Sequence, residues 1–416
     1  MSTPSPSHVV VVGAGMVGLS VAWFLQEYGV RVTILESRDV AAGSSWGNAG
    51  WVSPGLTAPL PEPSVLRYGL RSLLRKDAPL HVPARFDPSV ASFLLRFARH
   101  CTERDWKRAM DAYIPLNNEA HDAYDALGLA EESLTTTSAP IVAAFESRVQ
   151  ATSLLSELDA INQAGQAIDV KLLDGDTLHE SLPLLSSRVG FGIRIEGQRY
   201  IDPGVYTTAL GHAVVRRGAT LTIGATVTSL SRDRDRVSVG VHGRERISCD
   251  VAVLANGAWL SKLGSTLGVK TPVQAGRGYS FSVPTNGRVP SPVYFPAIRV
   301  ACTPLGYESL RVAGTMEFRK PDSRLDPARI ASIVRTTTPL FEGVDWQARR
   351  DEWVGPRPVT PDGMPLIGES VTKGVYVAGG HGMWGITLGP VTGKLLAMHI
   401  VTGHTPTQLL PFNPTR

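Results

Sequence analysis

The stretch Gly13-Ala14-Gly15-Met16-Val17-Gly18 decides the fold of this chain. It follows a run of valines, residues 9–12, and it opens a segment with helical character. A second apolar run then ends at Glu36, 18 residues after the third glycine. This order of strand, glycine-rich turn, helix, strand and acid is typical of a dinucleotide-binding βαβ unit. The helix N-terminus would face the phosphates and Glu36 a ribose diol. The alternative is a glycine-rich turn in another α/β fold.

Length and composition exclude several classes of protein. A chain of 416 residues is too long for one ordinary core and predicts two domains. The net charge of +4, from 41 basic and 37 acidic residues, argues against nucleic acid as a partner and is compatible with loose contact to an anionic membrane face. The three cysteines form no CxxC pair, so we expect neither a metal site nor a disulfide framework. No uninterrupted apolar run reaches about 18 residues, and no secretory signal pattern precedes the first strand.

Hydrophobic periodicity divides the chain into alternating segments. Residues 87–127 have helical spacing, and Pro115 predicts a break in that helix. A helix is predicted over 203–217 and a strand over 221–230. Residues 374–401 close the chain with a strand, a glycine-rich turn and a helix. A βαβ unit therefore opens the chain, a second nucleotide-type unit closes it, and helical and β-rich insertions lie between them.

Five segments together carry a resemblance to a known family. With the opening glycines, they are residues 44–54, 255–259, 357–368 and 380–385. On these segments the chain resembles the FAD-dependent D-amino-acid oxidase and glycine oxidase superfamily over nearly its whole length. Within that superfamily it is most similar to the D-amino-acid dehydrogenases of small-subunit type.

The resemblance implies an α/β protein, more closely an α+β arrangement of two domains. A Rossmann-like FAD-binding domain would contain residues 1–86, 192–275 and 355–416. A substrate domain built on a mixed sheet would contain residues 87–191 and 276–354.

The motifs and the resemblance together indicate the residues that hold FAD. Val227 is included for its backbone, although a core valine is an equal alternative. Gly47 stands where related enzymes with covalent flavin have a histidine, and no cysteine lies near the second glycine turn, so we expect non-covalent FAD. The expected FAD-binding residues are Gly13, Ala14, Gly15, Met16, Val17, Gly18, Glu36, Ser37, Ser44, Ser45, Asn48, Ala49, Gly50, Val227, Ala255, Gly257, Trp259, Gly382, Met383, Trp384, Gly385 and Ile386.

Three side chains are the catalytic candidates. Arg357 lies where the superfamily has the arginine that binds the substrate carboxylate, a task that suits a planar, permanently charged guanidinium. The alternative is a surface arginine in a proline-rich loop. Tyr279 is a candidate for the substrate pocket, as are Tyr294 and Trp51, although such aromatics more often belong to the core. His381, beside the second glycine turn, would orient substrate, tune the flavin, or make a structural hydrogen bond only.

The resemblance implies oxidative deamination of D-amino acids to 2-oxo acids and ammonia, by hydride transfer from Cα to flavin N5. Electrons would then pass to a quinone or another carrier, with oxygen as the alternative acceptor. One competing hypothesis is an oxidase or dehydrogenase of glycine, sarcosine or a cyclic imino acid such as D-hydroxyproline. Others are an FAD-bearing subunit of a hetero-oligomeric amine dehydrogenase and an NAD-dependent dehydrogenase. The expected location is the cytoplasm, with peripheral contact to the inner membrane face and oligomerisation left open.

Overall fold

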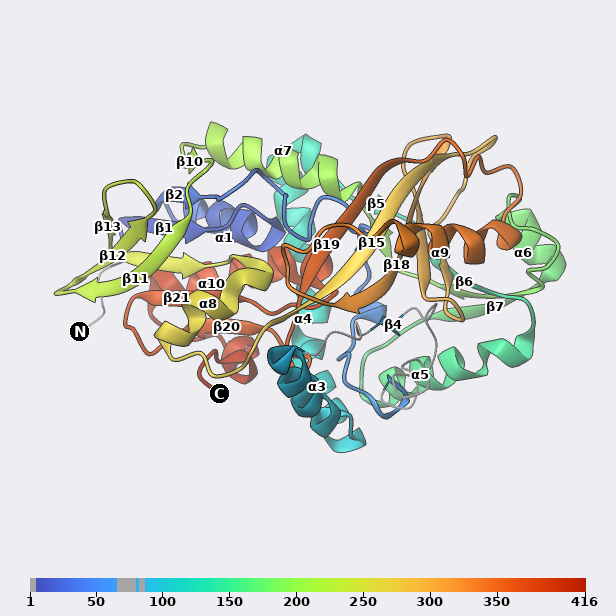
Figure 1. Ribbon diagram of the computed structural model, residues 1–416, viewed down its shortest axis with the longest axis horizontal. Helices are drawn as coiled ribbons and strands as arrows, with labels where there is room; N and C mark the ends of the chain where they lie inside the picture. Colours follow the sequence, from blue (N-terminus) through green and yellow to red (C-terminus); the bar gives the residue numbers. More distant parts are fainter. Residues whose placement is uncertain (1–4, 66–79, 82–86) are drawn as a thin grey trace.

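A largely parallel sheet forms the centre of one lobe of the molecule (Figure 1). The computed structural model describes residues 5–65, 80–81 and 87–416, and within these residues the sheet has six strands. The edge strand β20 runs antiparallel to its neighbour, and the other pairs are parallel. In spatial order the strands are β10 (Thr220–Thr222), β2 (Arg31–Leu35), β1 (His8–Val12), β14 (Val251–Leu254), β21 (Val375–Gly379) and β20 (Leu366–Glu369).

Helices cover one face of this sheet, and a small antiparallel sheet covers the other. Side chains alternate along a strand, so Val9 and Val11 join the core beneath the helices, whereas Val10 and Val12 face the small sheet. The helices are α1 (Met16–Glu27), α4 (Glu103–Ala130), α7 (Pro203–Arg216) and α10 (Gly385–Thr402). The opposite layer consists of β11 (Val227–Asp233), β12 (Arg236–Val241), β13 (Ile247–Cys249) and the short helix α8 (Leu260–Gly264).

Close packing of α1 against α10 brings two helix N-termini to one edge of the sheet. A Cβ on Gly389 would lie 2.7 Å from Cγ of Met16, and one on Gly393 would lie 2.5 Å from the carbonyl carbon of Ser20. Larger residues at these two positions would push the helices apart. Because α1 follows β1 and α10 follows β21, both N-termini lie at the carboxyl ends of the parallel strands, where open α/β sheets bind ligands.

A mixed sheet forms the second lobe and has nine strands among the described residues. Helices α9 (Pro327–Thr337) and α6 (Gly175–Ser181) share its main core, α5 (Thr152–Gln163) packs on β6 and β8, and α3 (Pro88–His100) packs near β18 and β19. The strand order is β19 (Arg350–Val359), β15 (Gln274–Pro284), β18 (Ser309–Phe318), β17 (Val300–Pro304), β16 (Val293–Phe295), β6 (Ile141–Phe145), β8 (Phe191–Ile195) and β7 (Val170–Asp174), with β4 (Leu80–His81) beside β18. A separate small sheet contains β3 (Trp51–Val52), β9 (Arg199–Tyr200) and β5 (Thr137–Ser138).

Several elements differ from the sequence-based expectation. Helix α4 continues through Pro115 without a break. The strand expected over 221–230 is two strands, β10 and β11, which belong to different sheets. No helix in the described ranges has the length and apolar character needed to span a membrane.

The expected domain limits also differ from the sheet boundaries. Strands β8 and β19 lie wholly in the mixed sheet, although residues 192–195 and 355–359 were expected in the FAD-binding domain. Helix α4, expected in the substrate domain, buries its apolar side chains in the core beneath α1 and α10. Of the first expected range, residues 1–4, 66–79 and 82–86 lie outside the described residues.

Candidate active site

The opening glycines form the tight turn between β1 and α1. Gly13 has a φ of +110°, and a Cβ there would lie 2.5 Å from the carbonyl oxygen of Ala255. A side chain on Gly18 would clash with the carbonyl oxygen of Gly13. Gly15 is the N-cap of α1 and has no side chain with which to cap it. Apart from the amide of Met16, which donates to the Ser45 hydroxyl, the N–H groups of the first helical turn therefore remain open to an anion.

The carboxylate of Glu36, at the end of β2, lies beside this turn. Its Oε2 accepts a hydrogen bond from the Ala14 amide at 2.9 Å. Its Oε1 accepts two, from the Arg38 amide at 2.8 Å and from the Ser37 hydroxyl at 3.2 Å. Each oxygen of an ionised carboxylate can accept a second hydrogen bond. The group is thus held in place, and its Oε2 retains capacity for a ribose hydroxyl.

The loop of residues 44–50 lies between α1 and the mixed sheet. The Oγ of Ser45 accepts a hydrogen bond from the amide of Met16 at 3.1 Å. On its other side, the hydroxyls of Ser280 and Thr303 donate to the carbonyls of Gly47 and Ala49, at 2.7 Å and 2.6 Å. Strands β15 and β17 therefore hold the loop against the phosphate-facing helix.

The second glycine turn leads from β21 into α10. Gly380 and Gly382 have positive φ values of +73° and +56°. The amide of Gly382 donates to the carbonyl of Pro358 at 2.8 Å, which ties the turn to β19. Helix α10 begins at Gly385, where N–H groups without an intrahelical acceptor can stabilise negative charge.

One cleft connects these four features. Its empty volume, open mouth included, is about 1340 Å³. Its walls include most of the residues expected to hold FAD, and His381 as well. These expected residues are Gly13, Gly15, Met16, Val17, Glu36, Ser37, Ser44, Ser45, Asn48, Val227, Ala255, Gly257, Trp259, Gly382, Gly385 and Ile386.

The remaining expected residues lie behind the walls of the cleft and support them. Trp384, for example, donates its indole N–H to the carbonyl of Ala58 at 2.7 Å. Met383 packs against a separate apolar cluster beside α3. The supporting residues are Ala14, Gly18, Ala49, Gly50, Met383 and Trp384.

Sequence reasoning missed two cations that line the cleft, Arg38 and Lys262. The Arg38 guanidinium stacks over the Trp259 ring at 4.5 Å, and the Trp259 indole N–H donates to the Asp322 carboxylate at 3.0 Å. The position of Arg38, two residues after Glu36, was a usable signal because it fixes the side chain at the end of β2. Lys262 had no such signal in the sequence.

His381 is buried in the wall of the cleft. Its Nε2 lies 3.0 Å from the Thr392 hydroxyl of α10. Burial lowers the pKa of His381 to about 4, so the ring is neutral at pH 7. A neutral ring bonded to α10 can hold the glycine turn in position without placing a positive charge there.

This burial predicts a pH-dependent loss of stability. The pKa of His381 falls from 6.5 in the unfolded chain to about 4, so the unfolded chain binds more protons between these values. The stabilisation by the neutral ring is present above pH 6.5 and disappears as pH falls towards 4, a change of about 3 kcal/mol. Thermal unfolding of wild type and of His381→Gln over this range should show a smaller pH slope for the variant. His404→Gln, at an exposed position, is the matched control and should keep the wild-type slope.

Arg357 lies on β19, directly beside the Pro358 wall of the cleft. Its guanidinium covers Gly278 of β15 so closely that a side chain there would collide with it. Its Nη1 donates to the carbonyl of Thr315 at 3.0 Å. Desolvation lowers its pKa to about 10, so the cation persists at neutral pH. Among the described residues no carboxylate lies within ion-pair distance, and Arg357 is thus a half-buried cation without a counter-ion.

A β-bulge in β18 supplies the carbonyl that Arg357 contacts. Thr315 and Met316 together oppose the single residue Gly278 of β15. Thr315 has a φ of +59°, a strained conformation for a β-branched residue. Such strain is characteristic of sites where the backbone must present a specific group. Nothing in the local sequence indicated this bulge.

The structure places Tyr279 away from Arg357, and it packs Trp51 and Tyr294 against one another. Tyr279 is fully buried on the α9 side of β15, donates its hydroxyl to Glu317 at 2.8 Å, and lies in a cluster with Arg277. Burial and the Glu317 carboxylate raise its pKa to about 12. Because side chains alternate along a strand, it projects from the face opposite to the one that Arg357 covers at Gly278. Trp51 and Tyr294 pack edge to face on one another, with ring centroids 5.8 Å apart.

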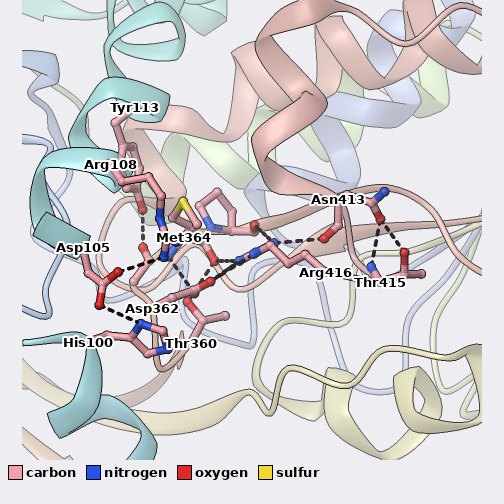
Figure 2. A network of polar contacts seen from close by, with 12 residues as sticks. His100, Asp105, Arg108, Tyr113, Thr360, Asp362, Met364, Asn413, Thr415 and Arg416 are labelled. Carbon is pink, nitrogen blue, oxygen red and sulfur yellow. Dashed lines mark hydrogen bonds and ion pairs between the residues drawn. The ribbon is translucent and has the colours of Figure 1, made fainter.

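Contacts from distant segments fix the turn that follows β19. In Figure 2 the Arg416 guanidinium reaches both oxygens of Asp362, at 3.0 Å and 3.2 Å. Arg416 also donates to the carbonyl of Met364 at 2.8 Å, and the Tyr113 hydroxyl of α4 donates to the carbonyl of Gly363 at 2.6 Å. This anchoring holds the end of the strand that carries Arg357.

Comparison with known proteins identifies the family. The model of the FAD dependent oxidoreductase family matches residues 8–398. The chain belongs to this family. The match confirms the resemblance seen in the motifs, the α/β fold with its Rossmann-like domain, and the use of FAD by an oxidoreductase.

Relatives of this FAD dependent oxidoreductase match over nearly the full length of both chains. It is 31% identical over 413 residues to a D-amino acid dehydrogenase from Xanthobacter autotrophicus, with 96% of each chain covered. Among solved structures it resembles glycine oxidase from Geobacillus kaustophilus, with a TM-score of 0.78 and 21% identity over 100% of this chain and 99% of that one. Iminodiacetate oxidase from a Chelativorans species has a TM-score of 0.72 and 20% identity over 98% of each chain. These two structures share the fold.

The residues around the cleft fit FAD. The N-terminus of α1 suits a diphosphate, and the Oε2 of Glu36 retains an acceptor for a ribose hydroxyl. The N-terminus of α10 suits the electron-accepting ring because reduction places negative charge there. The two helix N-termini lie at the same edge of one sheet, so a single elongated molecule can reach both.

Proposed function

We propose that this oxidoreductase oxidises the amine-bearing carbon of D-amino acids and releases the 2-oxo acid and ammonia. The observation that carries the proposal is the guanidinium of Arg357, which lies next to the second glycine turn and has no carboxylate partner within the part of the chain that the structure describes. A desolvated cation without a partner is costly unless an anion arrives, and a planar fork binds carboxylates in particular. The names of the relatives, D-amino acid dehydrogenase, support D-amino acids as the substrate class.

In this proposal the protein binds and orients, and FAD supplies the acceptor for the substrate hydride. Arg357 takes the substrate carboxylate with the two sides of its fork, while the Thr315 carbonyl fixes the guanidinium plane. The α10 N-terminus stabilises charge that develops in the site, and neutral His381 keeps the turn in place. We assign no protein base, because a neutral amine can expel the hydride as the C=N bond forms.

A substrate screen with an artificial electron acceptor tests the proposal. D-amino acids, their L-enantiomers, glycine, sarcosine and D-hydroxyproline should be compared, with peroxide release measured in parallel. Dye-linked turnover of D-amino acids with little peroxide is the expected result. Turnover confined to glycine, sarcosine or a cyclic imino acid would replace the proposed substrate, and stoichiometric peroxide would identify an oxidase. Activity that needs a co-purified partner would indicate a subunit of a larger dehydrogenase.

Non-covalent attachment of FAD is a separate part of the proposal. Gly47, where covalent relatives carry histidine, lies against the indole of Trp353, and a side chain there would collide with the ring. Acid precipitation of the purified protein should therefore leave all of the yellow flavin in the supernatant. Flavin that stays with the precipitated protein would contradict this prediction.

We further propose a quinone or carrier protein as the physiological acceptor. The proposed location is the cytoplasm, and a quinone would bring the protein to the inner face of the membrane through peripheral contact. Sedimentation with quinone-containing vesicles, compared with vesicles lacking quinone, measures that association. Equal recovery of the protein from both would argue for a soluble carrier.

A further inference from the structure

Two paired glycines, one on β15 and one on β19, leave room on one face of the mixed sheet for the side chains of Arg357 and Trp353. Gly278 of β15 is the cross-strand partner of Gly355 of β19. The Arg357 guanidinium lies over Gly278, and the indole of Trp353 lies over Gly355. Side chains of directly opposed residues are about 5 Å apart. The two large side chains therefore occupy adjacent places on the same sheet face, each made possible by the absence of a Cβ beneath it.

The indole of Trp353 also contacts the loop of residues 44–50, called the flavin loop below. A Cβ on Gly47 would collide with Cγ, Cδ2 and Cε3 of the indole, whereas a Cβ on Gly355 would collide with the far edge of its six-membered ring. The Ser280 hydroxyl donates to the Gly47 carbonyl at 2.7 Å and holds the loop at this place. The ring is thus enclosed between the loop and the strand, and its far edge points along β19 towards Arg357.

We propose that Trp353 is a positioning residue that sets the distance between the flavin loop and the carboxylate-binding guanidinium. The inference rests on the proposed role of Arg357. A rigid ring in contact with two glycines leaves the loop and the strand little freedom to slide, since a backbone position without Cβ lets the ring approach to contact distance. Substrate bound on Arg357 would then meet the flavin at a fixed separation. Displacements of about 1 Å in such an arrangement can cost up to about 100-fold in rate.

A double-mutant cycle tests the proposal on the flavin-loaded protein. The variants are Trp353→Ala, Gly355→Ala and the double variant, with Trp353→Phe as the conservative replacement. The readouts are the Kd of benzoate, a carboxylate that cannot be oxidised, from its perturbation of the flavin spectrum, and KM and kcat for a turned-over amino acid. Benzoate binding needs no turnover, so it remains informative if the proposed substrates are wrong.

We expect Trp353→Ala to raise the benzoate Kd about tenfold or more, and Trp353→Phe to recover most of the loss. Gly355→Ala should raise the Kd in the wild-type background and have no further effect in the Trp353→Ala background, because it acts through the ring. Gly287→Ala is the matched control, since a Cβ there has its nearest neighbour, Leu184 Cδ2, at 3.7 Å. If Gly355→Ala does not fold, Gly47→Ala tests the opposite contact of the ring in the same cycle.

Two results would overturn the inference. One is an unchanged benzoate Kd in Trp353→Ala that retains flavin. The other is an equal penalty from Gly355→Ala whether or not Trp353 is present, because this would make the glycine important for the strand alone. If D-amino acids are not oxidised while the benzoate Kd follows this cycle, the proposed substrate fails and the role of Trp353 stands.

Discussion

Replacement of Arg357 by leucine is expected to lower kcat/KM for the amino-acid substrate about 100-fold or more, with flavin still bound. Removing one partner of a desolvated, hydrogen-bonded charge pair costs about 2–5 kcal/mol. Flavin content should persist, because the Arg357 side chain is not part of the cleft wall. Steady-state kinetics together with the flavin-to-protein absorbance ratio measure both quantities on the same sample.

The variants of neighbouring positions sharpen this test. Arg357→Lys keeps the charge without the planar fork and should lie between wild type and Arg357→Leu. Gly278→Ala keeps Arg357 in the sequence but displaces its guanidinium, because the new methyl group would occupy the same space. This variant should therefore raise KM as well. Arg350→Leu, on the same strand at an exposed position, is the control and should behave as wild type. A wild-type kcat/KM for Arg357→Leu would remove the main support for a carboxylate substrate.

Replacement of Gly18 by alanine is expected to weaken FAD binding about 100-fold. The new methyl group would meet the carbonyl oxygen of Gly13, a backbone atom that no side-chain rotation can move away. Overpacking of this kind costs about 1–3 kcal/mol in a rigid place, and here it acts on the turn that faces the phosphates. Titration of the apoprotein with FAD, followed by flavin fluorescence, gives the Kd.

A control distinguishes this effect from a general loss of stability. Gly175 begins α6, and a Cβ there would lie 3.6 Å from its nearest neighbour, the Gly190 carbonyl oxygen. Gly175→Ala should therefore bind FAD as wild type does. Equal Kd values for Gly18→Ala and wild type would mean that the turn can open without loss of the cofactor.

Local patterns in the sequence predicted the nucleotide-binding half well. The geometry around Gly13 and Gly18 depends on a positive φ value and on close approaches that only glycine allows. The glycines that meet these requirements lie within six residues of sequence. Glu36 follows from the length of one helix and one strand. The second glycine turn, which ends at Gly385, precedes a helix in the same way. Such features are visible because all their partners lie within one βαβ or βα unit.

Side-chain directions in the mixed sheet could not be predicted in this way. Tyr279 and Gly278 are neighbours in the chain, yet one lies in the core beneath α9 and the other lies under Arg357. Which residue faces the site depends on the strand register and on the bulge at Thr315, and both depend on pairing between segments far apart in the sequence. Trp353, Gly355 and Arg357 alternate along the chain, and this spacing places them on one face of a strand. Their contacts could not be predicted, because these depend on Gly278 of the partner strand.

The sequence alone therefore determined the family, the cofactor and the glycine turns that face it, because the constraints on a nucleotide-binding turn are local. Only the tertiary structure decided that Arg357 has no counter-ion among the described residues and that Tyr279 belongs to the core. It also decided that the indole of Trp353 packs between the loop of residues 44–50 and the backbone of β19. These properties arise where strands β15, β18 and β19 meet the loop from the first lobe. A contact between segments more than 200 residues apart leaves no periodicity in the chain, and long-range register sets it instead.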